Sequence, residues 1–328
     1  MGRYLIMKNE TQCQGEKTNI YLDDELYEKL KNDAERFKIT RKDGSPNESR
    51  FINLVIKNFS GEYVHMTECR YENTLKMISE EVCDMSMDKL DRIARMVAYT
   101  NIDLLCKAKG RPCHNLSMYI CEENWPVILK PLNRTFKDKG ISTYIREMLH
   151  AFMQLPVYRR EQLIYADRIA AVEEAIRLHE SVCYKHPETQ KWHHFFPAYI
   201  GYSDHEFYNY VVGQIDNEEH NTYPVRIANM VGVCAAAEPA VFTEDFNVYL
   251  ERMKKNGIQF AVQDNRIFTV TVTRKGYDTF RKRYMERPVA VNTEFMDNDT
   301  VVMTFDCSEF QLDAFFRPFD GQIVEIRG

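Results

Sequence analysis

FFPAYIGYSDHEFYNYVVGQIDNEEHNTYPVRIANMVGV, residues 195–233, contains three short segments in which apolar and polar residues alternate. The segments cover about 195–202, 207–215 and 222–227, and runs rich in Asp, Asn and Glu separate them. Alternation with a period of two, bounded by such polar runs, is typical of half-buried antiparallel strands joined by hairpins. Because strands this short are not stable alone, we predict that they curl into a small barrel.

Three positions in this stretch follow the order of a known motif: Pro197, the tripeptide NYV at 209–211, and Arg226. In this order the stretch resembles a WYL domain, a small SH3-like barrel usually found after a DNA-binding domain in prokaryotic regulators. Two positions depart from the family, because Asn209 replaces the Trp of the tripeptide and Asn229 replaces a second Arg. The basic ligand surface is therefore thinner than is usual in the family.

The composition of the chain limits its class. At 328 residues it is long enough for two or more domains, and its 44% apolar content suits packed cores. A net charge of -6 means that any surface for nucleic acid must be local. We expect no membrane span and no secretory signal, since the apolar runs are too short for either. Nine cysteines without a C-x-x-C pair predict reduced thiols and a cytoplasmic protein.

The amino-terminal part has the pattern of a strand followed by two helices. Residues 17–22 alternate, with Ile20 and Leu22 on one side, and the acidic run at 23–25 can cap the helix that follows. A second helix begins near 45–47 and carries apolar residues at helical spacing. This order looks like a ribbon-helix-helix unit, which exposes half a core and pairs its strand antiparallel with that of a second copy.

An internal repeat indicates that the chain carries this second copy itself. NLSMYICEEN at 115–124 repeats TNIYLDDE at 18–25, and STYIREMLHAF at 142–152 repeats SRFINLVIKNF at 49–59. We therefore predict an intramolecular pair of ribbon-helix-helix units.

The remaining segments alternate between helical and strand patterns. Helices are expected at about 68–82, 87–105, 158–178 and 244–257. The last part predicts, in order, a strand at 268–273, a helix at 275–285, strands at 289–295 and 300–306, a helix around 310–315 and a strand at 322–327. This β-α-β-β-α-β order is ferredoxin-like and resembles the extension, called WCX, that accompanies WYL domains.

We therefore predict an α+β protein with a tandem ribbon-helix-helix module, an SH3-like WYL barrel and a ferredoxin-like C-terminal domain. The predicted divisions are 1–64 for the first ribbon-helix-helix copy, 65–106 for a helical linker, 107–156 for the second copy, 157–190 for a connecting helix, 191–240 for the barrel and 241–328 for the WCX-like domain.

The strand ribbon is the first candidate surface for nucleic acid. Paired strands of this kind lie in the DNA major groove and contact base edges with their outward side chains. Asn and Ser can bond bases, but this set has one cation and no arginine to pair with guanine. The module could instead serve only as a fold, a dimerisation surface or a docking site. The outward residues are Lys17, Asn19, Tyr21, Asn115, Ser117 and Tyr119.

Charge favours the second copy, where ten basic and four acidic residues lie between 107 and 160. In an acidic protein this excess is consistent with contacts to a phosphate backbone. A solvated helix face is the alternative.

The barrel and the WCX-like helix supply two further candidate surfaces. Aromatic rings beside an arginine suit the stacking of unpaired bases, as in single-stranded RNA, although strand alternation must bury some of these rings. The barrel candidates are Tyr202, His205, Asn209, Tyr210, Arg226 and Asn229. The helix candidates are Arg274, Lys275, Arg281 and Arg283, for which a charged amphipathic face is the alternative.

Enzyme motifs are missing from the sequence. The cluster of His179, Cys183, His186, His193 and His194 has no usual zinc spacing. No phosphate loop, G-x-G-x-x-G or G-x-S-x-G is present. Arg146 and His150 stand closer together than the pair of HEPN-type ribonucleases. We expect neither an enzyme nor a metal or other cofactor.

The order of the modules is similar to that of the WYL accessory proteins encoded beside type VI-D CRISPR effectors, which cleave RNA. The resemblance implies single-stranded RNA binding, enhancement of the effector ribonuclease in antiviral defence, and a homodimer formed by the WYL and C-terminal domains. The alternative is a ligand-responsive transcriptional regulator, in which the ribbon binds DNA and the barrel is the sensor. A purely structural dimeric scaffold remains if no nucleic acid binds.

Overall fold

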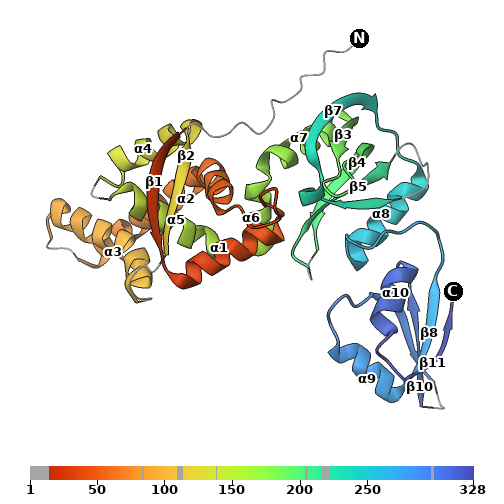
Figure 1. The fold of residues 1–328 in the computed structure, drawn as a ribbon. Helices are drawn as coiled ribbons and strands as arrows, with labels where there is room; N and C mark the ends of the chain where they lie inside the picture. Colours follow the sequence, from red (N-terminus) through yellow and green to blue (C-terminus); the bar gives the residue numbers. More distant parts are fainter. Residues whose placement is uncertain are drawn as a thin grey trace, which may run out of the picture. The chain divides into compact units, whose positions relative to one another are not determined.

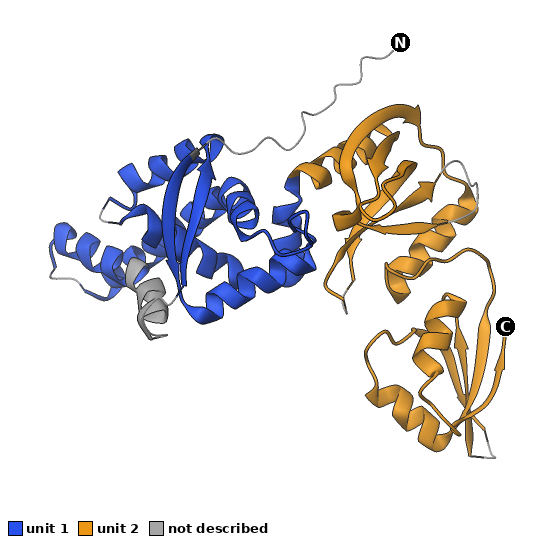
Figure 2. Ribbon diagram, viewed as in Figure 1, with its two compact units in different colours: residues 1–166 blue, residues 167–328 orange. Residues whose placement is uncertain are grey.

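The computed structural model describes residues 15–82, 85–108, 114–137, 139–203, 206–215, 222–296 and 299–328 (Figure 1). The chain divides into two compact units, residues 1–166 and 167–328 (Figure 2). Helices and antiparallel sheets occur in both units, so the predicted α+β class is confirmed.

Unit 1 is mainly helical, with two strands far apart in the sequence. Its elements are β1 (Gly15–Leu22), α1 (Asp24–Arg36), α2 (Glu48–Glu81), α3 (Met87–Ala108), β2 (His114–Cys121), a short 3-10 helix (Glu122–Asn124), α4 (Trp125–Arg134), α5 (Ile141–Met153) and α6 (Val157–Ile164).

The two strands of unit 1, β1 and β2, pair antiparallel and lie side by side in Figure 1. In the ladder Asn19 stands opposite Ser117. Ile20 and Met118 belong to the buried face, which rests on the helices. The alternation of the sequence therefore gives the ribbon one apolar face and one polar face.

The second helices of the two repeats, α2 and α5, form the core beneath the ribbon. The ring of Phe152 on α5 packs edge-on against Phe51 and Phe59 of α2, with centroids 6.0 and 5.6 Å apart. Each helix also bonds the backbone of the strand from the other repeat. The Asn53 amide donates to the Tyr119 carbonyl at 2.9 Å, and the Arg146 guanidinium donates to the Tyr21 carbonyl at 3.5 Å.

Two helix predictions are wrong in their extent. The helix that starts at Glu48 continues to Glu81 without a break, so the boundary predicted at 64/65 falls inside α2. No proline interrupts this helix, and Gly61 lies where its missing side chain would meet open space. The long helix expected at 158–178 is two helices, because α6 ends at Ile164 and α7 begins at Ala166. The hydroxyl of Tyr165, between them, donates to the Phe37 carbonyl.

Unit 2 begins with a five-stranded antiparallel sheet and one helix on either side of it in sequence. The elements are α7 (Ala166–Leu178), β3 (Glu180–Lys185), β4 (Trp192–Tyr202), β5 (Asn209–Ile215), β6 (Tyr223–Arg226), a 3-10 turn (Ile227–Asn229), β7 (Val231–Pro239) and α8 (Glu244–Asn256). The strand order is β6-β5-β4-β3-β7. The three predicted strands are β4 to β6, whereas β3 and β7 were not predicted. The boundary at 190/191 is therefore wrong, since it separates β3 from its sheet.

The last part of unit 2 is a four-stranded antiparallel sheet with two helices. Its elements are β8 (Phe268–Thr273), α9 (Arg274–Lys282), β9 (Ala290–Phe295), β10 (Thr300–Phe305), α10 (Glu309–Phe316) and β11 (Ile323–Arg327). The strand order is β11-β8-β10-β9. The order of strands and helices is the predicted one.

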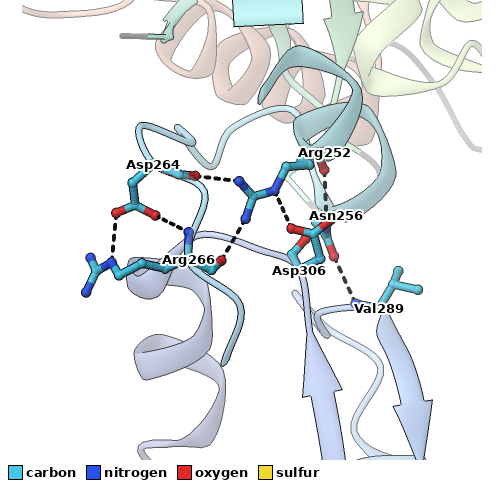
Figure 3. Close-up of polar contacts among 6 residues, drawn as sticks. All are labelled: Arg252, Asn256, Asp264, Arg266, Val289 and Asp306. Carbon is cyan, nitrogen blue, oxygen red and sulfur yellow. Dashed lines mark hydrogen bonds and ion pairs between the residues drawn. The ribbon is translucent and has the colours of Figure 1, made fainter. Parts of the chain in front are cut away.

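Arg252 of α8 joins the two sheets of unit 2 through a polar latch (Figure 3). Its guanidinium, only 6% exposed, forms an ion pair with Asp306 and donates to the carbonyls of Asp264 and Arg266. One turn later, Asn256 donates to the Asp306 carbonyl at 2.8 Å and accepts from the Val289 amide at 3.0 Å (Figure 3). We call these contacts the Arg252 latch.

The cysteine expectation needs a correction. Cys69, Cys183, Cys234 and Cys307 are free thiols, but Cys121 is disulfide-bonded. Among the described residues, no helix is long and apolar enough to cross a membrane.

Phe152→Ala tests whether the two repeats share one core. Phe152 is fully buried between both copies, so we expect a loss of about 3–5 kcal/mol in the free energy of unfolding. Urea unfolding of the full chain, followed by helical circular dichroism, measures it. Met77→Ala, at a site 68% exposed on α2, is the control and should change stability by less than about 0.5 kcal/mol. If Phe152→Ala unfolds with the same free energy as the wild type, the two repeats do not share one core.

Arg252→Met tests the latch. Removing one member of a buried ion pair leaves the other without compensation, at a cost of about 3 kcal/mol. We expect faster proteolysis in 257–267 and a larger radius of gyration by X-ray scattering. Lys255→Met, an exposed change on the same helix, should alter neither quantity. Identical cleavage of Arg252→Met and wild type would show that other contacts hold the C-terminal domain.

Candidate nucleic-acid interface

The outward face of the ribbon in unit 1 presents the predicted residues to solvent. Lys17, Asn19 and Ser117 are exposed, as are the rings of Tyr21 and Tyr119, which are 47% and 54% exposed. Two tyrosines thus stand near opposite ends of the ladder, with small polar side chains between them. The face can donate and accept hydrogen bonds, but it holds a single lysine beside the exposed Glu16.

Some of the basic residues of the second repeat are used in contacts inside unit 1. Lys139 pairs with the fully buried Glu147. Arg160 forms an ion pair with Asp33 at 2.6 Å and also donates to the Leu155 carbonyl. These cations hold the helices together, so they are not free for contacts to phosphates. Lys107, Lys109, Arg111 and Asp138, which entered that count, lie outside the described side chains. The exposed cations that remain are Lys130, Arg134 and Lys137.

Arg226 and Tyr210 come together in unit 2, as predicted, because they are direct partners on β6 and β5. Opposite residues of an antiparallel pair share one face of the sheet. The Arg226 guanidinium lies over the Tyr208 ring, 3.3 Å from its centroid. The Tyr210 hydroxyl donates to the Glu206 carboxylate. The result is a half-buried cluster of two tyrosines, one arginine and one carboxylate, which we call the Arg226 cluster.

Helix α8 packs on the same face of the sheet as the Arg226 cluster. Val212, two residues after Tyr210 and on the same face, packs against Phe246 and Met253, and Tyr210 packs partly against the same apolar group. A strand places every second residue on one face, so this contact follows from the alternation. Part of the Tyr210 ring is therefore structural, and only its outer part can reach a ligand.

Three other barrel candidates do not join this cluster. Asn209 is fully buried, and Tyr202 is its cross-strand partner on the opposite face from Tyr210. Asn209 therefore cannot contact a ligand at the surface, which corrects the prediction. Asn229 lies half-buried in the 3-10 turn after β6. His205 lies outside the described residues.

Predicted cations of the C-terminal domain divide into two kinds. Arg274 and Arg283 lie over the rings of Phe295 and Phe315, with 4.6 and 5.3 Å from guanidinium carbon to ring centroid. Such contacts cover apolar rings and hold the guanidinium in place. Lys275 and Arg281 are exposed, and neither forms an ion pair within the described part of the chain. These two extend into solvent.

Two members of the Arg226 cluster, Glu206 and Tyr208, are not among the candidates selected from the sequence. Period-two alternation places Tyr208 on the face of Tyr210, which was a usable signal. No sequence pattern points to Glu206, because its contact depends on the loop before β5.

The histidines of β4 show no geometry for hydrolysis. The Nε2 atom of His194 lies 2.8 Å from the Ser181 hydroxyl and 3.7 Å from the Glu238 carboxylate. A catalytic relay needs the serine and the acid on different ring nitrogens. Burial raises the pKa of the Cys307 thiol to about 12, so that thiol stays protonated at neutral pH. Within the described residues, no group of three His, Cys, Asp or Glu could hold a metal ion.

No family model and no curated protein sequence matches the chain. Several solved structures match it, among them the following two. One is titled "Crystal structure of a CRISPR Cas-related protein", with a TM-score of 0.66 and 18% identity, covering 97% of this chain and 91% of that one. The other is "Proteasome accessory factor B/C (PafBC) of Arthrobacter aurescens", with a TM-score of 0.22 and 13% identity over 49% of this chain and 24% of that one. The first likeness shows a shared fold along nearly the whole chain.

Asn209→Ala tests the reassignment of Asn209 from ligand contact to structure. Asn209 is fully buried, so removal of its side chain should cost about 1–3 kcal/mol in unfolding free energy. Arg226→Gln, at the half-exposed partner of Tyr210, should cost less than about 1 kcal/mol. Urea unfolding of both variants measures these two losses of stability. Equal stability of Asn209→Ala and wild type would return Asn209 to the list of ligand candidates.

Proposed function

We propose that the chain is a CRISPR-associated accessory protein without catalytic activity of its own. In this proposal it binds single-stranded RNA and enhances an RNA-guided ribonuclease of type VI-D. The observation that carries the proposal is the fold shared with a CRISPR Cas-related protein over 97% of this chain. Likeness along the whole chain supports a common architecture of all modules, rather than one reused domain.

The finer fold assignments belong to the same proposal. The strand-helix-helix repeats with paired strands β1 and β2 support a ribbon-helix-helix module. The strand order β11-β8-β10-β9 with two helices supports a ferredoxin-like domain. Motif positions 209–211 and Arg226 lie on adjacent strands, which supports a WYL domain. We further propose a cytoplasmic homodimer that acts in antiviral defence.

RNA binding is assigned to the Arg226 cluster. Single-stranded nucleic acids are held by aromatic rings that stack on bases and by cations near the phosphates. Tyr208, Tyr210 and Arg226 supply both groups on one face of the sheet. Since the ring under Arg226 fixes the guanidinium, less freedom is lost when RNA binds.

A DNA-binding regulator is the second candidate function. The observation in its favour is the outward face of the ribbon, where Asn19 stands opposite Ser117 and both are exposed. Paired strands present such side chains to base edges in the major groove. The small number of cations on this face argues for weak binding to duplex DNA.

Titration against labelled single-stranded RNA, single-stranded DNA and duplex DNA of equal length tests the proposal. We expect the tightest binding to RNA, weakened by salt because counterions are released from the phosphates. Addition of the protein to a guide-loaded type VI-D effector should raise the rate of RNA cleavage. Preferential binding to duplex DNA would favour the regulator and the ribbon.

Tyr210→Ala and Arg226→Ala test the assigned site. Loss of one stacked ring or one fixed cation should weaken RNA binding about tenfold, since such a contact is worth about 1–3 kcal/mol. Val248→Ala, an exposed change on α8, is the matched control and should bind as wild type does. Wild-type affinity of both site variants would move the RNA site away from the Arg226 cluster.

A further inference from the structure

Trp192 is an exposed tryptophan on the outer face of the five-stranded sheet, away from the Arg226 cluster. It begins β4, and 61% of its surface is open to solvent. Tyr210 stands opposite Gly201, near the other end of β4. Along a strand, nine residues cover at most about 30 Å. The tryptophan therefore forms a separate surface on the same sheet.

The indole ring lies across the sheet. Trp192 is the direct partner of Lys185 on β3, and β3 in turn pairs with β7. At Gly232 of β7, a methyl group would stand 3.7 Å from the Cη2 atom of Trp192. The ring thus reaches from β4 over β3 towards β7. The φ angle of Gly232 is +63°, a left-handed backbone conformation that favours glycine.

Two lysines lie close to Trp192 in the sheet pairing or in the sequence. Lys185 is its cross-strand partner and Lys191 is its neighbour in sequence. The His186 amide donates to the Lys191 carbonyl at 2.9 Å, which closes the hairpin that carries both lysines. Neither lysine forms an ion pair with a carboxylate in the part of the chain that the structure describes. The acidic residues nearby are Glu188 in the hairpin and Glu238 beside His194.

A lone exposed ring between two cations is a poor protein interface. Protein interfaces have a contiguous apolar core from which lysine is depleted. Among the described residues, no large apolar side chain of β3 or β7 is exposed, and Val231 and Val233 of β7 are half-buried. Trp192 therefore has no large exposed apolar neighbour on these two strands. An open aromatic face beside cations fits an unpaired base and its phosphates instead.

We propose that Trp192, with Lys185 and Lys191, is a second stacking site for the single-stranded RNA bound by the Arg226 cluster. The ring stacks on one base, and the two ammonium groups contact the adjacent phosphates. The proposal rests on the proposed function and adds to it a second point of contact on the same strand. Two contacts joined by one RNA strengthen each other, because the second binds at a high local concentration.

Tryptophan emission gives a direct readout. The chain has two tryptophans, so Trp125→Phe leaves Trp192 as the sole fluorophore. Stacking of a base on an exposed indole quenches its emission. We expect saturable quenching by an oligouridylate of roughly 20 nucleotides, longer than the 4–16 that one small barrel covers. The quenching curve should coincide with the binding curve from anisotropy of the labelled RNA.

Trp192→Ala in the otherwise unchanged chain measures the contribution to affinity. We expect about tenfold weaker RNA binding, and a smaller loss for Trp192→Phe, which keeps a ring. Lys185→Ala and Lys191→Ala should each reduce the slope of log affinity against log salt concentration by about one, because each removes one phosphate contact. Phe310→Ala, which removes a ring 72% exposed on α10, is the control and should change nothing.

Two results would overturn the inference, and they differ from a failure of the proposed function. Tight RNA binding with unchanged Trp192 emission and a wild-type affinity of Trp192→Ala would reject the stacking site while RNA binding stands. A changed oligomeric state of Trp192→Ala at unchanged RNA affinity would identify a protein interface instead. Absence of RNA binding by the wild-type chain, by anisotropy, would reject the proposed function and this site with it.

Discussion

The antiparallel pairing of β1 with β2 is the contact on which unit 1 depends. Each repeat alone would expose the apolar side of its strand and one face of its second helix. Pairing covers both at once, since Ile20 and Met118 then rest on the shared core of Phe51, Phe59 and Phe152. The cross-repeat bonds from Asn53 and Arg146 to the strand backbones fix the register. The polar face of the ribbon is exposed as a consequence.

Local periodicity predicted the helices and strands of the C-terminal part well. It predicted less well the elements that depend on packing against distant segments, such as β7 and the second half of α2. The strand predicted at 268–273 has those limits in the structure, because its residues alternate strictly between Phe or Val and Thr. β7 was missed because its alanines from 235 to 237 alternate neither in size nor in polarity. The continuity of α2 was missed because the polar residues that follow Phe59 conceal the helical repeat, although nothing in them breaks a helix. Both elements depend on contacts with distant segments, and a single sequence carries little information about such contacts.

The candidate site shows the same limit at the scale of side chains. Tyr210 and Arg226 met as expected, because two positions in adjacent strands can be direct partners whatever lies around them. Asn209 is one residue away and points to the other face, where it is fully buried. Motif position alone therefore could not separate ligand contacts from core. Trp192 was not selected from the sequence, because its neighbour Gly232 lies forty residues later on a strand that was not predicted.

The distance between β1 and β2 along the chain also matters while the protein is being made. The first repeat leaves the ribosome long before its partner, and α5 is complete only at Met153. At a synthesis rate of about 5–20 residues per second, this delay is on the order of ten seconds. During that time the part of α2 that packs against Phe152 lacks its partner from the second repeat. The first copy is therefore a nascent segment that a chaperone can bind. The length of chain between the two repeats sets how long the first copy stays without its partner during synthesis.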